Sequence, residues 1–124
     1  MKPFLELGAM VGMPLQVSVA AATLADMSAI PLKRNTMIGL LIVAYKVMSD
    51  QLISFEDISK RIRMSVSRIH ASESYVLAYL DWNVWICHEI YDEMYRKACP
   101  MMCCSTCNVC NRMHYVSEKC LENA

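Results

Sequence analysis

The segment NTMIGLLIVAYK at residues 35–46 is the strongest indication of the fold. It carries no charge before Lys46, and its large apolar side chains fall on all sides of an α-helix. A helix that is apolar all round is normally buried among other helices. Gly39 and Ala44 are small enough to let such neighbours approach closely. We therefore predict an all-α, compact bundle of about five helices around a central apolar helix at residues 36–48.

The segments around this central helix also have helical patterns and few strictly alternating residues, which argues against a sheet. Three polar residues are expected to cap helix starts. Asn35 is placed to cap the central helix, and Ser54 with Asp57 three residues later matches a capping box. Ser65 or Ser67 is expected to begin the next helix. The other expected helices are residues 3–12, 14–29, a short one from Ser54, and 66–80, resuming over 85–97.

Length and composition limit the possible classes of protein. The chain has 124 residues, 56% of them hydrophobic and 19% charged, which suits one folded domain and excludes general disorder. Its formal net charge is zero, which argues against a nucleic-acid partner. Four basic residues are expected to form an exposed helix face. The alternative is that they contact an acidic partner or a phosphate. This group comprises Lys60, Arg61, Arg63 and Arg68.

Cysteine is distributed very unevenly along the chain. Of the seven cysteines, only Cys87 lies before residue 98. This divides the sequence into a helical domain at residues 1–97 and a cysteine-rich tail at 98–124. A body with one cysteine has no disulfide framework, so we expect an intracellular protein of the cytoplasm or nucleus. Residues 7–25 are uncharged but too mixed for a signal peptide or a stable membrane span.

The tail contains a candidate metal site. Four soft ligands lie within a short stretch, Cys104, Cys107, Cys110 and His114. Three thiolates and one imidazole are a known ligand set for structural zinc, with Cys103 or Cys120 as a substitute for the histidine. Palmitoylation of Cys103 and Cys104 is a second possibility. A tail of free thiols with no defined role is the third. No other cofactor is expected.

Two charged residues occupy apolar positions in the predicted helices. Lys46 ends the uncharged stretch, and Glu73 lies between Ile69 and Val76 on the apolar face of helix 66–80. A charge in such a stripe needs a partner. The spacing favours a pair between Lys46 and Glu73, or a lysine that reaches solvent. The alternative is that both line a surface covered by another protein, with Trp82 nearby as an aromatic anchor.

At these positions the sequence resembles the cyclin box over roughly residues 14–86. The resemblance is carried by LLIVAYK at 40–46 and by ESYVLAYLDWNV at 73–84, together with the interval between their lysine and glutamate. Asp26 is similar to the aspartate of the cyclin Asp-Arg motif, although Met27 replaces the arginine. The first helix is shorter than in cyclins, and the chain has no room for a second cyclin box.

The resemblance implies a non-catalytic regulatory subunit that binds and activates a cyclin-dependent protein kinase. It also implies a kinase-binding set of residues, Lys46, Glu73, Leu77, Trp82 and Val84. No phosphate-binding glycine motif or catalytic grouping is visible, and His70, His88 and His114 are scattered, so we expect no enzyme. The alternative function is a small zinc-binding module, with the helical body as its scaffold.

Overall fold

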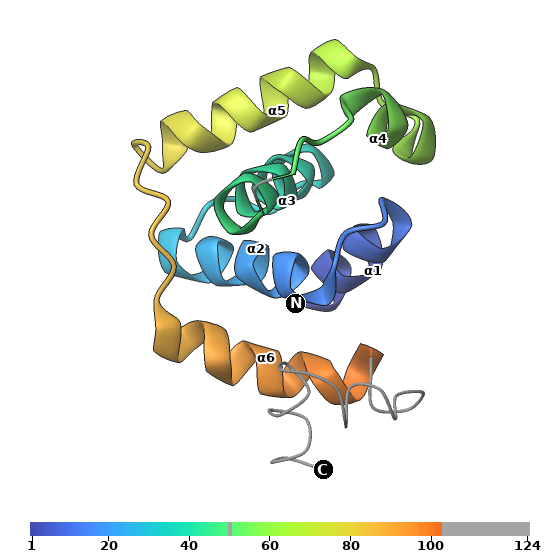
Figure 1. Cartoon of the computed structure of the whole chain (residues 1–124). Helices are drawn as coiled ribbons and strands as arrows, with labels where there is room; N and C mark the ends of the chain where they lie inside the picture. Colours follow the sequence, from blue (N-terminus) through green and yellow to red (C-terminus); the bar gives the residue numbers. More distant parts are fainter. Residues whose placement is uncertain (50, 103–124) are drawn as a thin grey trace.

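The computed structural model describes residues 1–49 and 51–102, and this part of the chain is built from helices alone. The prediction of an all-α protein is confirmed, with six helices rather than about five (Figure 1). In chain order they are α1 (Lys2–Met10), α2 (Leu15–Ser28), α3 (Arg34–Met48), α4 (Phe55–Ile62), α5 (Val66–Tyr79) and α6 (His88–Met102).

Helix α3 lies at the centre, between α2 on one side and α5 on the other (Figure 1). Every residue from Ile38 to Ala44 is buried, as expected for a helix with apolar side chains on all sides. Gly39 brings α3 against α5, because a Cβ added at this glycine would lie 2.5 Å from the carbonyl oxygen of Ser72. The predicted core helix and its close contact are therefore confirmed.

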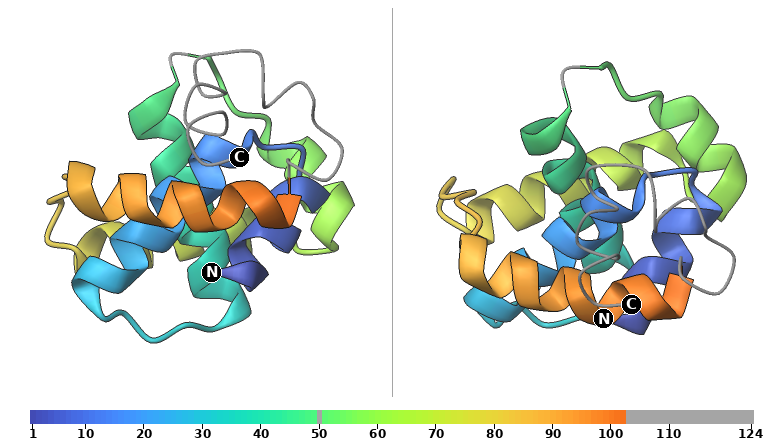
Figure 2. Two further views of the ribbon diagram at one scale, coloured as in Figure 1. Left: turned by 90° about the horizontal axis from the view of Figure 1, so that it is seen from below. Right: turned by 60° about the horizontal axis from the view of Figure 1, so that its bottom comes forward.

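Helix α2 is a second buried helix, which the sequence pattern did not reveal. All residues from Val17 to Ala25 are buried, because α2 lies between α3 and α6 (Figures 1 and 2). Helix α6 covers α2 with Tyr95 and Ala98, which pack with Leu5 and Val19. The predicted boundary between the helical domain and the tail, after residue 97, falls inside α6, because this helix continues to Met102.

Local capping explains where two of the helices begin. The Ser54 hydroxyl accepts a hydrogen bond from the Asp57 N–H (3.2 Å) at the start of α4. The Ser65 hydroxyl accepts one from the Arg68 N–H (3.3 Å) at the start of α5. These bonds satisfy N–H groups that have no partner inside the helix. They confirm the predicted capping role of Ser54. They also show that Ser65, and not Ser67, caps α5.

The predicted cap at Asn35 is wrong. Helix α3 begins at Arg34, and its N-cap is Lys33, whose extended backbone is followed by a first turn without any side-chain cap. The Arg34 guanidinium donates a hydrogen bond to the carbonyl of Ile62 (3.0 Å), so a contact with the end of α4 helps to hold this start. Asn35 is therefore the second residue of the helix.

The connection between α5 and α6 also differs from the prediction. Residues 85–87 are not helical, and α6 begins at His88 instead of resuming from Trp85. The connection passes the C-terminal end of α2, where the Cys87 N–H donates to the sulfur of Met27 (3.3 Å). It thereby carries the chain from α5 across the edge of the bundle to the far side of α2 (Figure 1).

The uncharged stretch at residues 7–25 is divided between two helices. Its first part ends α1, and its second part forms most of α2 in the protein core. Within residues 1–49 and 51–102, no helix has both the length and the apolar character that crossing a bilayer requires.

Candidate protein-binding groove

The five residues in the predicted kinase-binding set surround one pocket of about 550 Å³. The pocket lies beside the C-terminal half of α3, the second half of α5 and the turn that follows α5. We call it the docking groove, and its lining comprises Lys46, Glu73, Leu77, Trp82 and Val84, with Val43, Val47 and Ser74. Residues that are far apart in the sequence are therefore brought to one surface.

A short ion pair forms one side of the docking groove. The Lys46 ammonium lies 2.6 Å from a carboxylate oxygen of Glu73. The Glu73 side chain is only 11% exposed, whereas that of Lys46 is 49% exposed. Lys46 also lies over the ring of Phe55, 5.3 Å from its centroid. The expected pairing of the two charges is confirmed, and the same pair lines the groove.

The two charges depend on each other unequally. A buried carboxylate is costly without a partner, and among the described residues Lys46 is the one that forms an ion pair with Glu73. A half-exposed ammonium can be solvated on its own, and it has three donors to share. Lys46 can therefore hold Glu73 and still donate to a group on another molecule.

Trp82 projects from a tight turn at the end of α5. Asp81 and Trp82 both have left-handed backbone angles, with φ of 54° and 60°. The Trp82 N–H donates to the Leu77 carbonyl (2.9 Å), which closes the turn. Trp82 is 72% exposed, so it does not cover the core. Left-handed backbone at a residue other than glycine costs on the order of 1 kcal/mol, and such strain clusters at functional sites.

The floor of the docking groove is apolar. Val43 is buried, while Leu77 and Val84 pack against the core with part of their surface open to the groove. Val47 is 45% exposed on the rim. Exposed tryptophan beside aliphatic side chains is frequent in protein-binding surfaces.

Four contributors to this site were not predicted from the sequence, and one of them is Val43 in the central helix. Val47 and Ser74 directly follow Lys46 and Glu73, and their adjacency was a usable signal. Phe55 lies under Lys46 only because α4 packs beside α5, so no local pattern could have indicated it. Asp26, the other residue of the cyclin resemblance, is exposed on α2 and is not part of the groove.

The two histidines in the described part of the chain, His70 and His88, make separate contacts. His70 stacks on Phe55 with ring centroids 4.2 Å apart, and His88 lies 3.2 Å from Asp92 on α6. Within residues 1–49 and 51–102, no three His, Cys, Asp or Glu residues are grouped to hold a metal ion. The tail ligands lie outside the described residues, as do both candidate palmitoylation sites. They are Cys103, Cys104, Cys107, Cys110, His114 and Cys120.

The docking groove combines three kinds of surface. It joins an apolar floor, an exposed aromatic side chain and a partly buried ion pair on two helices that also form the centre of the fold. Compared with protein-family models, with curated proteins and with solved structures, the chain has no match in any of the three.

Proposed function

We propose that the chain is a cyclin-like, non-catalytic regulatory subunit that binds and activates a cyclin-dependent protein kinase through the docking groove. One observation carries the proposal. The five residues that the cyclin resemblance implies come from two helices and a turn, and they line a single pocket. The central position of α3 between α2 and α5 supports the same proposal, because the resemblance implies a bundle around this helix.

Each part of the docking groove has a distinct role in this proposal. Trp82, Leu77 and Val84 supply the apolar area that a partner buries, and tryptophan is among the residues that contribute most to binding energy. The Lys46–Glu73 pair sets the register, because a partner must match two fixed charges of opposite sign.

Activation follows from binding one state of the kinase more tightly than another. An active kinase needs an ion pair between a lysine and a glutamate, and the helix that carries this glutamate must be in position. A rigid helical surface that contacts this helix only in its active position shifts the population toward the active state. The regulatory subunit then contributes contacts and no chemistry of its own.

Glu73→Ala is the variant that tests the charged part of this proposal. We expect it to weaken kinase capture about tenfold, because a fixed charge at the interface is lost. We expect the fold to persist, because the remaining Lys46 is half-exposed and can be solvated. The measurement is capture of kinase by the intact immobilised chain, with circular dichroism as the check on helicity.

The matched control is Glu56→Ala, which removes an exposed carboxylate on α4 outside the docking groove. This control should capture kinase as well as the unaltered chain does. Equal capture by all three proteins would contradict the proposed role of Glu73. A loss of helicity confined to Glu73→Ala would show that the residue serves the fold and not the interface.

A further inference from the structure

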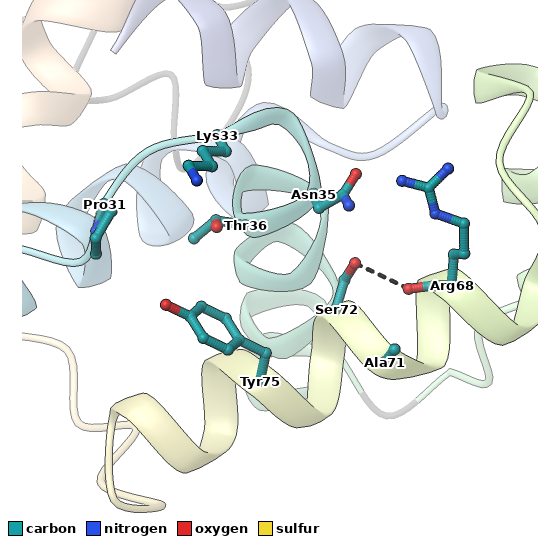
Figure 3. Close-up of a pocket in the computed structure, with 8 residues that line it drawn as sticks. All are labelled: Pro31, Lys33, Asn35, Thr36, Arg68, Ala71, Ser72 and Tyr75. Carbon is teal, nitrogen blue, oxygen red and sulfur yellow. Dashed lines mark hydrogen bonds between the residues drawn. The ribbon is translucent and has the colours of Figure 1, made fainter.

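A second pocket, of about 400 Å³, lies at the opposite end of α3. It lies between the N-terminal end of α3 and residues 68–75 of α5, and Figure 3 shows the side chains that line it. Thr36 in this pocket and Lys46 in the docking groove are about 15 Å apart along the axis of α3. The two pockets share no lining residue, so binding at this second pocket does not depend on the proposed kinase binding.

The Thr36 hydroxyl is buried in this pocket without a partner. Its residue is 6% exposed, and the described part of the chain provides no hydrogen bond to its side chain. The nearby Ser72 differs, because its hydroxyl donates to the Arg68 carbonyl (2.9 Å), as Figure 3 shows. A buried polar group without a partner costs free energy, and folded proteins rarely contain one. The Thr36 hydroxyl is therefore available to a bound group.

The start of α3 leaves backbone donors next to the same pocket. Its N-cap, Lys33, provides no side-chain cap, and Met37 is the first residue whose N–H reaches back to the Lys33 carbonyl (2.9 Å). The N–H groups of residues 34–36 precede that first bond. The first N–H groups of a helix, together with the helix dipole, attract anions.

The side chains around this helix start are basic or neutral. Lys33 and Arg68 line the pocket, and none of its described lining residues is acidic. Asn35 lies beside the Arg68 guanidinium in Figure 3, with its amide group turned toward it. Arg34 does not take part, since its guanidinium is bonded to the Ile62 carbonyl. Two cations and one hydroxyl thus line the same pocket beside a helix N-terminus, with Lys33 and Thr36 on one side of the first turn of α3 and Arg68 on the other in Figure 3.

We infer that this pocket binds a phosphate monoester, namely a phosphorylated serine or threonine side chain of a partner protein. Arginine and helix N-termini both suit the sets of oxygens on a phosphate group. Pro31, Ala71 and the half-exposed Tyr75 ring supply an apolar wall next to these donors. That wall has no role for a free phosphate ion, but it can pack against the carbon atoms of an ester.

The test is a titration of the intact, isotope-labelled chain followed by NMR at constant ionic strength. The probes are inorganic phosphate, phosphothreonine blocked at both ends, and blocked threonine without phosphate. We expect both phosphate probes to shift the backbone amides of residues 34–36, and blocked phosphothreonine to bind more tightly. Blocked threonine should cause no shift.

Two variants connect the binding to the pocket. Arg68→Gln and Thr36→Val should each weaken the binding of blocked phosphothreonine about tenfold, because each removes a donor to the phosphate. Thr36→Val should also raise the melting temperature, since it removes a buried hydroxyl without a partner. Lys60→Gln removes an exposed cation on α4 and should leave binding unchanged.

Three results would overturn the inference. The first is that no phosphate probe shifts the amides of residues 34–36. The second is that Lys60→Gln weakens binding as much as Arg68→Gln, which would indicate general charge attraction. The third is that inorganic phosphate binds and blocked phosphothreonine does not, which would exclude an ester as the ligand.

Discussion

Trp82→Ala is expected to weaken kinase binding about 30-fold or more, equivalent to about 2 kcal/mol, without changing the stability of the chain. Trp82 is 72% exposed, so removal of its side chain exposes little of the core. On kinase binding, the same side chain would be buried against the apolar floor formed by Leu77 and Val84. The measurements are titration calorimetry with a purified kinase and thermal unfolding of the free chain.

The chain contains a matched control for this variant. Trp85 lies three residues further on, is 64% exposed and is not part of the docking groove. Trp85→Ala should therefore bind kinase as the unaltered chain does. If both variants weakened binding equally, the effect would reflect general loss of exposed aromatic surface. If Trp82→Ala bound normally, the docking groove would not be the binding surface.

Gly39→Ala is expected to lower the free energy of unfolding by about 2 kcal/mol. The added methyl group would lie 2.5 Å from the Ser72 carbonyl oxygen and 2.7 Å from a methyl carbon of Val76. The carbonyl belongs to the backbone of α5, so the two helices must move apart to accommodate it. The free energy lost by moving the helices apart exceeds the gain of about 1 kcal/mol that alanine brings over glycine in a helix interior. Urea unfolding followed by circular dichroism measures the change.

Gly8→Ala is the comparison for this prediction. A Cβ at Gly8 meets the hydroxyl of Ser18, which belongs to a side chain and can rotate, whereas the Ser72 carbonyl cannot. We therefore expect a smaller loss of stability for Gly8→Ala than for Gly39→Ala. A stability of Gly39→Ala equal to or above that of the unaltered chain would show that α3 and α5 are less closely packed than the structure indicates.

The elements of the fold that could be predicted are those with local causes. The uncharged stretch at 35–45 marks the central helix, because a helix that is apolar on every side is normally buried. Ser54 and Ser65 mark helix starts, because each satisfies an N–H group three residues ahead. Asn35 failed as a cap because the start of α3 is held in part by a contact between Arg34 and Ile62.

The reason that α6 is a separate helix, and not a continuation of α5, is hard to recognise in the sequence. The chain turns after α5 through Asp81 and Trp82, both with left-handed backbone, where glycine would be the usual signal. Without a glycine, the pattern after Trp85 resembles a continuation of the helix. The burial of α2 is hidden for a related reason, since it depends on α6 folding back over that helix.

The candidate site is predictable where charge and apolar pattern conflict. Lys46 and Glu73 each interrupt an apolar stripe, and this conflict is visible in the order of the residues alone. The phosphate pocket shows the limit of such reasoning. Lys33 lies in a connector, Thr36 in α3 and Arg68 in α5, and only the packing of α3 against α5 brings them together. For the same reason, the sequence groups Arg68 with the basic residues of the neighbouring segment.

Whether the chain binds and activates a kinase can be measured by calorimetric titration of the intact chain into purified monomeric cyclin-dependent kinases, with peptide phosphorylation measured on the same samples. We predict a saturable one-to-one complex with at least one kinase, and a rise in its activity on binding. Trp85→Ala should retain this complex, and Trp82→Ala should lose most of it. If no kinase formed a complex, or if Trp82→Ala left the complex unchanged, the proposed function would be contradicted.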